Sequence, residues 1–252
     1  MSTYVMADIH GNSAAFDAIL SMIKLQPDDH LYILGDVIDR GPDGITLLQR
    51  IRRMENCVLL LGNHEHMMIN ALRDPHNPWH QRNWRRNGCA PTYAAFNAMD
   101  AESQEDLLQY VESLPLQTSV TVQSDAGETE YILVHAAPID MYESVGRMFY
   151  ADVREYQVWH RLPMTKPDEL GGKTLIFGHT PTEYMQFSEW PKMRIAHGDG
   201  VIDIDCGCAY PQYGGQLGCL RLDDGMEFYS EEGTVTRAGA AAWKAEQMRR
   251  RS

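Results

Sequence analysis

The first third of the chain alternates short apolar runs with segments of helical periodicity. The apolar runs Tyr4–Met6, Leu31–Leu34 and Val58–Leu61 predict three buried strands. Between them, apolar residues recur at helical spacing over Ser13–Leu25 and over residues 45–54, which predicts two helices. Strands that alternate with helices usually pair in parallel, with the helices on the sheet faces. We therefore expect an α/β fold.

The pattern changes twice in the rest of the chain. Residues from about 64 to 115 have a mostly helical pattern that is rich in aromatic and basic side chains. Beyond it, short strand-like segments predict a second sheet packed on the first: 117–122, 130–135, 174–178, 193–196, 201–205, 217–222 and 226–230. The stretch from about 238 to 251 is predicted as a basic terminal helix. No repeat or low-complexity linker separates these parts, so we expect one domain over residues 1–252.

Composition and charge narrow the class of protein. The chain has 22 Lys and Arg against 35 Asp and Glu, a net charge of −13, which disfavours a nucleic-acid partner. The sequence contains no run of about 18 apolar residues, so no membrane span is predicted. The start MSTYVMADIHGN lacks a secretory signal. Five irregularly spaced cysteines are expected to be free thiols in a reducing compartment. These observations predict a cytoplasmic protein that neither binds nor crosses a membrane.

Polar side chains follow the predicted strands. They occur at Asp8–Asn12, Gly35–Gly41 and Gly62–Glu65, and as His135 and His179 after two later strands. One Asp or His after a strand is ordinarily a turn residue or a helix cap, but five such strand ends argue for a shared site, because ligands bind outside the carboxyl ends of strands. Carboxylate, imidazole and amide groups suit divalent ions such as Mn, Fe or Zn. A water between two such ions loses its proton near neutral pH and can attack phosphorus directly.

The motifs DIHGN, GDVIDRG and GNHE, with HAA and GHT later, resemble the metal-dependent PPP-type phosphoprotein phosphatases. The nearest pattern is the small bacterial and bacteriophage-lambda-type branch of serine/threonine phosphatases. The resemblance also covers the segments Trp84–Gly88, Trp159–Arg161 and Ile202–Asp205, and spans roughly residues 3–230. It implies a metallophosphoesterase-like α/β fold with four layers, α/β/β/α, in which two mixed sheets pack face to face with helices outside.

The same resemblance implies roles for individual residues. The implied metal ligands are Asp8 and His10 for one ion, Asp36 as the bridge, and Asn63, His135 and His179 for the other ion. The implied catalytic residues are His64 as the general acid, Asp39 as its orienting partner, and Arg40 and Arg161 as ligands of phosphate oxygens. We expect two divalent ions, with Mn²⁺ as the first choice and Fe, Zn, Ni or Co as alternatives.

The expected activity is hydrolysis of phosphomonoesters, with phosphoserine or phosphothreonine in a protein or peptide as the first choice of substrate. The alternative is a symmetrical dinucleoside-tetraphosphate hydrolase, which uses the same motifs on an anhydride. Small phosphoesters remain candidate substrates. A phosphodiesterase would prefer an open basic groove, which the charge of −13 does not suggest, and the intact ligand set argues against an inactive binding module. We expect the helical segment at about 64–115 to shape specificity.

Overall fold

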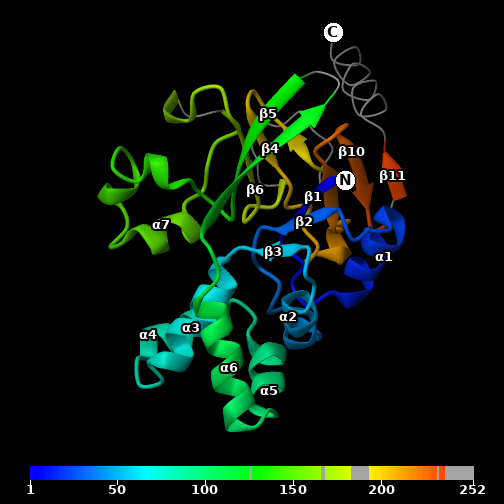
Figure 1. Cartoon of the computed structure of the whole chain (residues 1–252). Coiled ribbons are helices and arrows are strands. Elements are labelled where there is room, and N and C mark those ends of the chain that lie inside the picture. The colour runs from blue at the N-terminus through cyan, green and yellow to red at the C-terminus, as the bar shows by residue number, and fades with distance from the viewer. Residues whose placement is uncertain (125–126, 166–167, 183–192, 232, 236–252) are drawn as a thin grey trace.

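The computed structural model of the chain describes residues 1–124, 127–165, 168–182, 193–231 and 233–235. It contains two β-sheets with helices around them (Figure 1). The sequence-based expectation of an α/β fold with two mixed sheets is confirmed.

The first sheet joins the start of the chain to its later part. Its strand order is β11-β10-β9-β1-β2-β3. Three strands are parallel to one another: β1 (Thr3–Met6), β2 (His30–Ile33) and β3 (Cys57–Leu59). The other three continue the sheet with antiparallel pairing: β9 (Gly218–Arg221), β10 (Met226–Tyr229) and β11 (Gly233–Val235).

The second sheet is built from the middle of the chain and has the order β4-β5-β6-β8-β7. Its central strands run parallel: β5 (Gly127–Val134), β6 (Thr174–Phe177) and β8 (Val201–Asp203). Its edge strands pair antiparallel: β4 (Gln117–Ser124) and β7 (Ala196–His197).

Alternation along the strands explains why the two sheets pack face to face. Val5 and Leu34 of the first sheet share one buried cluster with Leu133 and Ile176 of the second. Successive residues of a strand point to opposite faces, so the neighbours of these residues point outward. The outward residues of each sheet belong to a separate cluster that contains helical side chains. The layers are therefore helix, sheet, sheet, helix, as expected.

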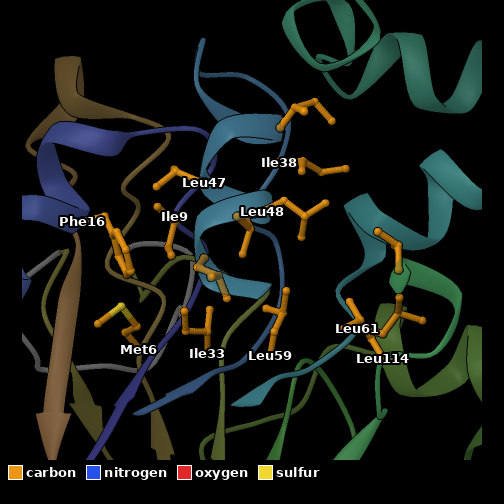
Figure 2. Close-up of a cluster of buried hydrophobic side chains, with 14 of the residues drawn as sticks. Met6, Ile9, Phe16, Ile33, Ile38, Leu47, Leu48, Leu59, Leu61 and Leu114 are labelled. Atoms are coloured by element: carbon orange, nitrogen blue, oxygen red, sulfur yellow. The ribbon is translucent and has the colours of Figure 1, made fainter. Parts of the chain in front are cut away.

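Helices α1 (Ser13–Ile23) and α2 (Gly44–Arg52) cover the outer face of the first sheet. Figure 2 shows Phe16 of α1 and Leu48 of α2 pointing into the same cluster as Met6 and Ile33 of the strands. The side chain of Asn12 caps α1 by accepting a hydrogen bond from the backbone N–H of Ala15 at 3.0 Å. These contacts fix the loops that follow β1 and β2.

Four consecutive helices confirm the helical pattern expected from about 64 to 115. They are α3 (Asn63–Arg73), α4 (Pro78–Arg86), α5 (Ala90–Asn97) and α6 (Ala101–Glu112). In Figure 1 these helices extend away from the sheets as one group. On the second sheet, α7 (Val153–Trp159) and single turns at Ile139–Met141, Gly146–Met148 and Asp168–Leu170 supply the outer layer. A further single turn is Pro211–Tyr213.

The strand predicted at 193–196 is wrong in its extent. The observed strand there is Ala196–His197, because Met193 has a φ of 58°, in the left-handed region that interrupts extended backbone. Strand β11 was not expected from the sequence, whereas the basic helix predicted at 238–251 lies outside the described residues. The single-domain organisation over residues 1–252 stays a prediction.

Two further expectations concern the surroundings of the protein. Within the described part of the chain, no helix combines the length and apolar character needed to cross a bilayer. All five cysteines are free, as expected; Cys57 is half-buried and the other four are buried. Burial raises the pKa of Cys57 to about 12, which keeps this thiol protonated and unreactive at neutral pH.

Candidate active site

Nine of the ten residues assigned to the site from the sequence follow the carboxyl ends of strands. Asp8 and His10 follow β1; Asp36, Asp39 and Arg40 follow β2; Asn63 and His64 follow β3; His135 follows β5; His179 follows β6. Arg161 is the exception, since it follows α7. The parallel strands of both sheets thus deliver these side chains to one place, as expected for an α/β site.

The backbone is strained where it carries these residues. Among the described residues, eight other than glycine have a positive φ. Six of them belong to the site: Asp8 (56°), His10 (50°), Asp36 (53°), Asp39 (68°), Arg40 (66°) and His179 (69°). Residues other than glycine adopt this conformation only when the surrounding structure holds them there, and such residues cluster at functional sites. The strained backbone therefore lowers the stability of the fold and orients these six side chains toward the site.

A first group of ligand atoms surrounds Asn63. The amide oxygen of Asn63 lies 3.0 Å from Nε2 of His135 and 2.9 Å from Nδ1 of His179. His135 donates from Nδ1 to the carbonyl oxygen of Leu34 at 2.6 Å, and burial lowers the pKa of His135. Its Nε2 therefore carries a lone pair that faces the amide oxygen, another acceptor. A cation between the two would turn this repulsion into coordination.

Asp36 links this group to a second one. Its Oδ1 lies 3.6 Å from Nε2 of His135, and its Oδ2 lies 3.7 Å from Nε2 of His10. His10 Nδ1 donates a hydrogen bond to the carbonyl oxygen of Ile38 at 3.1 Å. Its Nε2 therefore also carries a lone pair, which faces the carboxylate of Asp36. Oδ2 of Asp36 is 3.9 Å from Nε2 of His64 as well. The two oxygens of Asp36 thus face two separate groups of donors, as a bridging ligand requires.

Asp8 lies beside these groups without joining either. The compact groupings are His10 with Asp36 and His64, and Asp36 with His135 and His179, each with ligand atoms within 4.8 Å of one another. Oδ2 of Asp8 accepts a hydrogen bond from the backbone N–H of His179 at 3.0 Å. A metal role for Asp8 stays a prediction.

The buried ionisable groups of the site repel one another and would be stabilised by cations. Burial and the carboxylates of Asp205 and Asp36 raise the pKa of Asp8 well above its usual range, and burial raises that of Asp205 to about 7. Burial also lowers the pKa of His10 and His179 far below the usual range, so both imidazoles are neutral. Crowded buried carboxylates beside neutral imidazoles are the donor set of a divalent-metal site.

His64 is held by a buried carboxylate. Nδ1 of His64 donates to Oδ2 of Asp39 at 2.7 Å, and both residues are fully buried. The indole N–H of Trp84 donates to the same oxygen at 2.8 Å, and the backbone N–H of Asp39 donates to Thr92 Oγ1 at 2.8 Å. Burial acts to lower the pKa of His64, but the carboxylates of Asp36 and Asp39 outweigh it and raise that pKa. His64 is therefore placed and charged as a proton donor would be.

Both expected arginines line a cavity of about 460 Å³ together with His10, Asp36, Asn63 and His179. Nη2 of Arg40 lies 3.1 Å from Nε2 of His64, and Arg161 donates from Nη1 to Thr180 Oγ1 at 2.7 Å. The guanidinium of Arg40 lies over the ring of Tyr210, 5.2 Å from its centre. The structure therefore brings all ten predicted residues to this cavity or to the buried layer directly behind it.

Glu65 has a role that the sequence reasoning missed. Its buried carboxylate accepts hydrogen bonds from the backbone N–H groups of Asp36 and Val37, both at 2.9 Å, and of Gly62 at 3.1 Å. A side chain at position 62 would collide with the carboxylates of Asp36 and Glu65, so glycine is required there. Glu65 thus ties the loop after β2 to the start of α3. The position of Glu65 in the motif GNHE is the sequence feature that could have indicated this role.

Three further residues around the site were missed as individual residues: Trp84, Asp205 and Tyr210. Trp84 and Asp205 lie in segments that carried the resemblance, which gave them no role. Tyr210 and Asp205 line the cavity, and the carboxylate of Asp205 accepts from the backbone N–H of Gly207 at 2.9 Å. Nothing in the local sequence around Tyr210 indicates that the chain returns to the cavity at this point.

Comparison with known proteins agrees with this geometry. The family profile described as calcineurin-like phosphoesterase matches residues 1–204. A symmetrical bis(5'-nucleosyl)-tetraphosphatase of Erwinia tasmaniensis is 42% identical over 67 residues, which cover 26% of this chain and 24% of that protein. A protein of the same name from Acidovorax sp. is 28% identical over 153 residues, which cover 60% of this chain and 49% of that protein. The chain thus matches half or less of the length of these curated relatives.

Among solved structures, the cold-active protein-tyrosine phosphatase of a psychrophilic Shewanella species superposes with a TM-score of 0.58 at 17% identity. The match covers 93% of this chain and 80% of that protein, so the two share a fold. The match over residues 1–204 identifies the chain as a member of the calcineurin-like phosphoesterase family, and the buried His and Asp groups that could hold metal ions agree with this membership.

Proposed function

We propose that the chain hydrolyses phosphorus–oxygen bonds at this site with two divalent ions. One observation carries the proposal: the lone pairs of His10 Nε2 and His135 Nε2, fixed by their Nδ1 hydrogen bonds, face oxygen acceptors 3.7 and 3.0 Å away. Bonds of about 2.0–2.2 Å to one ion separate neighbouring ligand atoms by roughly these distances. Bound ions would lower the pKa of a water and offset the charge of phosphate oxygens.

In this proposal His10, Asp36 and Asp8 hold one ion. Asp36, Asn63, His135 and His179 hold the other ion. Mn²⁺ is the first choice for both positions, because the mixed oxygen and nitrogen ligand set suits it; Fe, Zn, Ni and Co remain alternatives. The cytoplasmic location expected from the sequence stays part of this proposal.

The protein's own residues then have three tasks. His64 gives a proton from Nε2, which lies beside Asp36 and Arg40 of the cavity, to the oxygen that leaves. Asp39 and Trp84 orient His64 and favour its charged form. Arg40 and Arg161 bind the equatorial oxygens of the phosphoryl group, where negative charge spreads in the transition state.

The substrate class that we propose is a dinucleoside tetraphosphate, split symmetrically into two nucleoside diphosphates. The support is the name of the curated relatives, which matches the alternative that the sequence motifs left open. In this reaction the oxygen of a water forms a bond to one of the two central phosphorus atoms. The bridging oxygen leaves with the other nucleoside diphosphate and takes up a proton.

A phosphoserine or phosphothreonine protein remains the second candidate because of the pair His64–Asp39. An alkoxide is a poorer leaving group than a phosphate, so a proton donor matters most for the hydrolysis of esters. His64 is fully buried, and its Nδ1 lies 2.7 Å from Oδ2 of Asp39, which holds it in place for this role. A phosphoserine or phosphothreonine protein, which the motifs alone favoured, therefore ranks second after the dinucleoside tetraphosphate.

A substrate panel with the Mn²⁺-loaded enzyme separates the two candidates. It compares kcat/KM for diadenosine tetraphosphate with that for phosphoserine, phosphothreonine and phosphotyrosine peptides. We expect a preference of more than about 100-fold for the dinucleotide, equivalent to about 2.7 kcal/mol in transition-state stabilisation. A preference of similar size for a phosphopeptide would reject the proposed substrate class and leave the two-metal proposal intact.

A further inference from the structure

A second cavity lies next to the one that contains the candidate metal ligands. It has a volume of about 330 Å³ and lies between α3, α4 and the segment that leads into and through α7. We call it the aromatic pocket, after the rings of Trp79, Tyr150 and Trp159 in its wall. Trp159 lines both cavities, and its ring meets that of His179 edge-on, with centres 6.0 Å apart. The two cavities therefore adjoin at Trp159, which places the aromatic pocket close to a ligand whose phosphates lie near His179.

The two cavities differ in charge. Arg40 and Arg161 line the first, whereas no Lys or Arg is among the described residues that line the aromatic pocket. Its one carboxylate is Glu155, and burial lowers the pKa of His66 to about 4, so this imidazole is neutral at pH 7. Phosphate groups suit the first cavity. The aromatic pocket suits an uncharged planar group.

The polar groups of the pocket match the edge of a nucleobase. Asn70, Asn83 and Glu155 lie in its wall. A side-chain amide can bond an adenine edge through two hydrogen bonds, and a carboxylate can accept from an exocyclic amino group. His66 accepts from Asn70 through Nε2 at 3.2 Å, and its Nδ1 has no hydrogen-bond partner among the described residues. Aromatic faces beside such groups are how proteins hold single bases.

We propose that the aromatic pocket binds one nucleobase of a dinucleoside polyphosphate, while the phosphate chain lies in the adjoining cavity. This inference rests on the proposed function, and it adds the location of the residues that select the substrate. Trp79 is the stacking residue that can be changed most safely, because it is 61% exposed. Trp159 also touches His179, so its substitution would disturb both cavities.

The test compares Trp79→Ala with Phe149→Ala in the Mn²⁺-loaded enzyme. Phe149 is a matched control, because it is 71% exposed and neighbours Tyr150 without lining the pocket. Steady-state kinetics are measured with diadenosine tetraphosphate, with a phosphoserine peptide, and with p-nitrophenyl phosphate, which carries neither a base nor a peptide. We expect Trp79→Ala to raise KM for the dinucleotide by about 5- to 150-fold, the effect of losing one stacked base. The kcat for the dinucleotide and the kinetics on p-nitrophenyl phosphate should stay within about twofold, and Phe149→Ala should match the wild type.

The outcomes separate this inference from the proposed function. If the wild type hydrolyses the dinucleotide well and Trp79→Ala leaves its KM unchanged, the pocket proposal is wrong and the function stands. If the wild type hydrolyses p-nitrophenyl phosphate and not the dinucleotide, the substrate class itself is wrong. If Trp79→Ala raises KM for a phosphopeptide and leaves that of the dinucleotide unchanged, the pocket holds a peptide side chain. Equal loss in both variants would also overturn the proposal, since it would mark a general surface effect.

Discussion

The two adjoining cavities of this protein are built in opposite ways. The candidate metal site is formed by strand-end residues that are almost completely buried: Asp36 is 2% exposed and His135 is 0% exposed. The aromatic pocket is formed by helical and loop residues, and its Trp79 is 61% exposed. The first carries strained backbone and fixed hydrogen bonds, whereas the second carries one exposed ring, Trp79, and two half-buried rings, Tyr150 and Trp159. The difference suggests that the chemistry is held rigidly by the sheets and that the substrate is chosen by the helical layer.

Removing the bridge between the two donor groups should have the largest effect. Asp36→Asn removes the charge that faces both His10 and His135, and each ion held there would contribute several kcal/mol to stabilising the transition state. We expect kcat to fall by about 10³-fold or more for every substrate, with the fold retained by circular dichroism. Asp28→Asn, at an exposed carboxylate after α1, is the matched control and should retain full activity. A fall confined to one substrate would contradict a shared metal site.

Replacing the proton donor should separate esters from anhydrides. His64→Asn should lower kcat for a phosphoserine peptide by about 10²–10⁴-fold, and less for diadenosine tetraphosphate, whose leaving group needs less protonation. The raised pKa of His64 keeps it protonated to higher pH, so ester hydrolysis should decline as pH rises through that pKa. Profiles of kcat against pH should show this decline in the wild type and not in His64→Asn. Equal losses for both bond types would remove His64 from the role of proton donor.

A smaller effect is expected from the residue that orients the pair. Trp84→Phe keeps an aromatic ring and removes the N–H that donates to Asp39 at 2.8 Å. Hydrogen bonds to a charged group are worth about 1.5–3 kcal/mol, so kcat for esters should fall by about 10- to 100-fold. Because Trp84 is buried, the melting temperature should be measured alongside. If stability falls while kcat stays constant, Trp84 serves packing alone.

The proximity of the candidate metal ligands could be expected from the sequence, whereas that of the residues around the aromatic pocket could not. Asp8, Asp36 and Asn63 each follow a strand, and parallel pairing alone brings such residues to one edge. Trp79 lies on α4 and Tyr150 lies in the segment before α7, and both α4 and α7 contact α3. No periodic pattern connects them, so their proximity had to be observed.

Roles that act through the backbone were also not assigned from the sequence. Glu65 follows His64 in a motif that was recognised, yet its carboxylate serves the N–H groups of Asp36 and Val37 in another loop. Strand β11 was missed because its three residues, Gly233–Val235, include only one apolar side chain. The short extent of β7 follows from the positive φ of Met193, which residue type alone does not indicate.

The number of metal ions bound per chain tests the central claim most directly. Protein stripped with a chelator is titrated with Mn²⁺ by calorimetry, and hydrolysis of p-nitrophenyl phosphate is followed at each point. We expect about two ions per chain, no activity before the titration, and full recovery as the second ion binds. For Asp36→Asn we expect weaker binding and no recovery. Full activity after thorough chelation, or no uptake of Mn²⁺ or any alternative ion, would contradict a two-metal site.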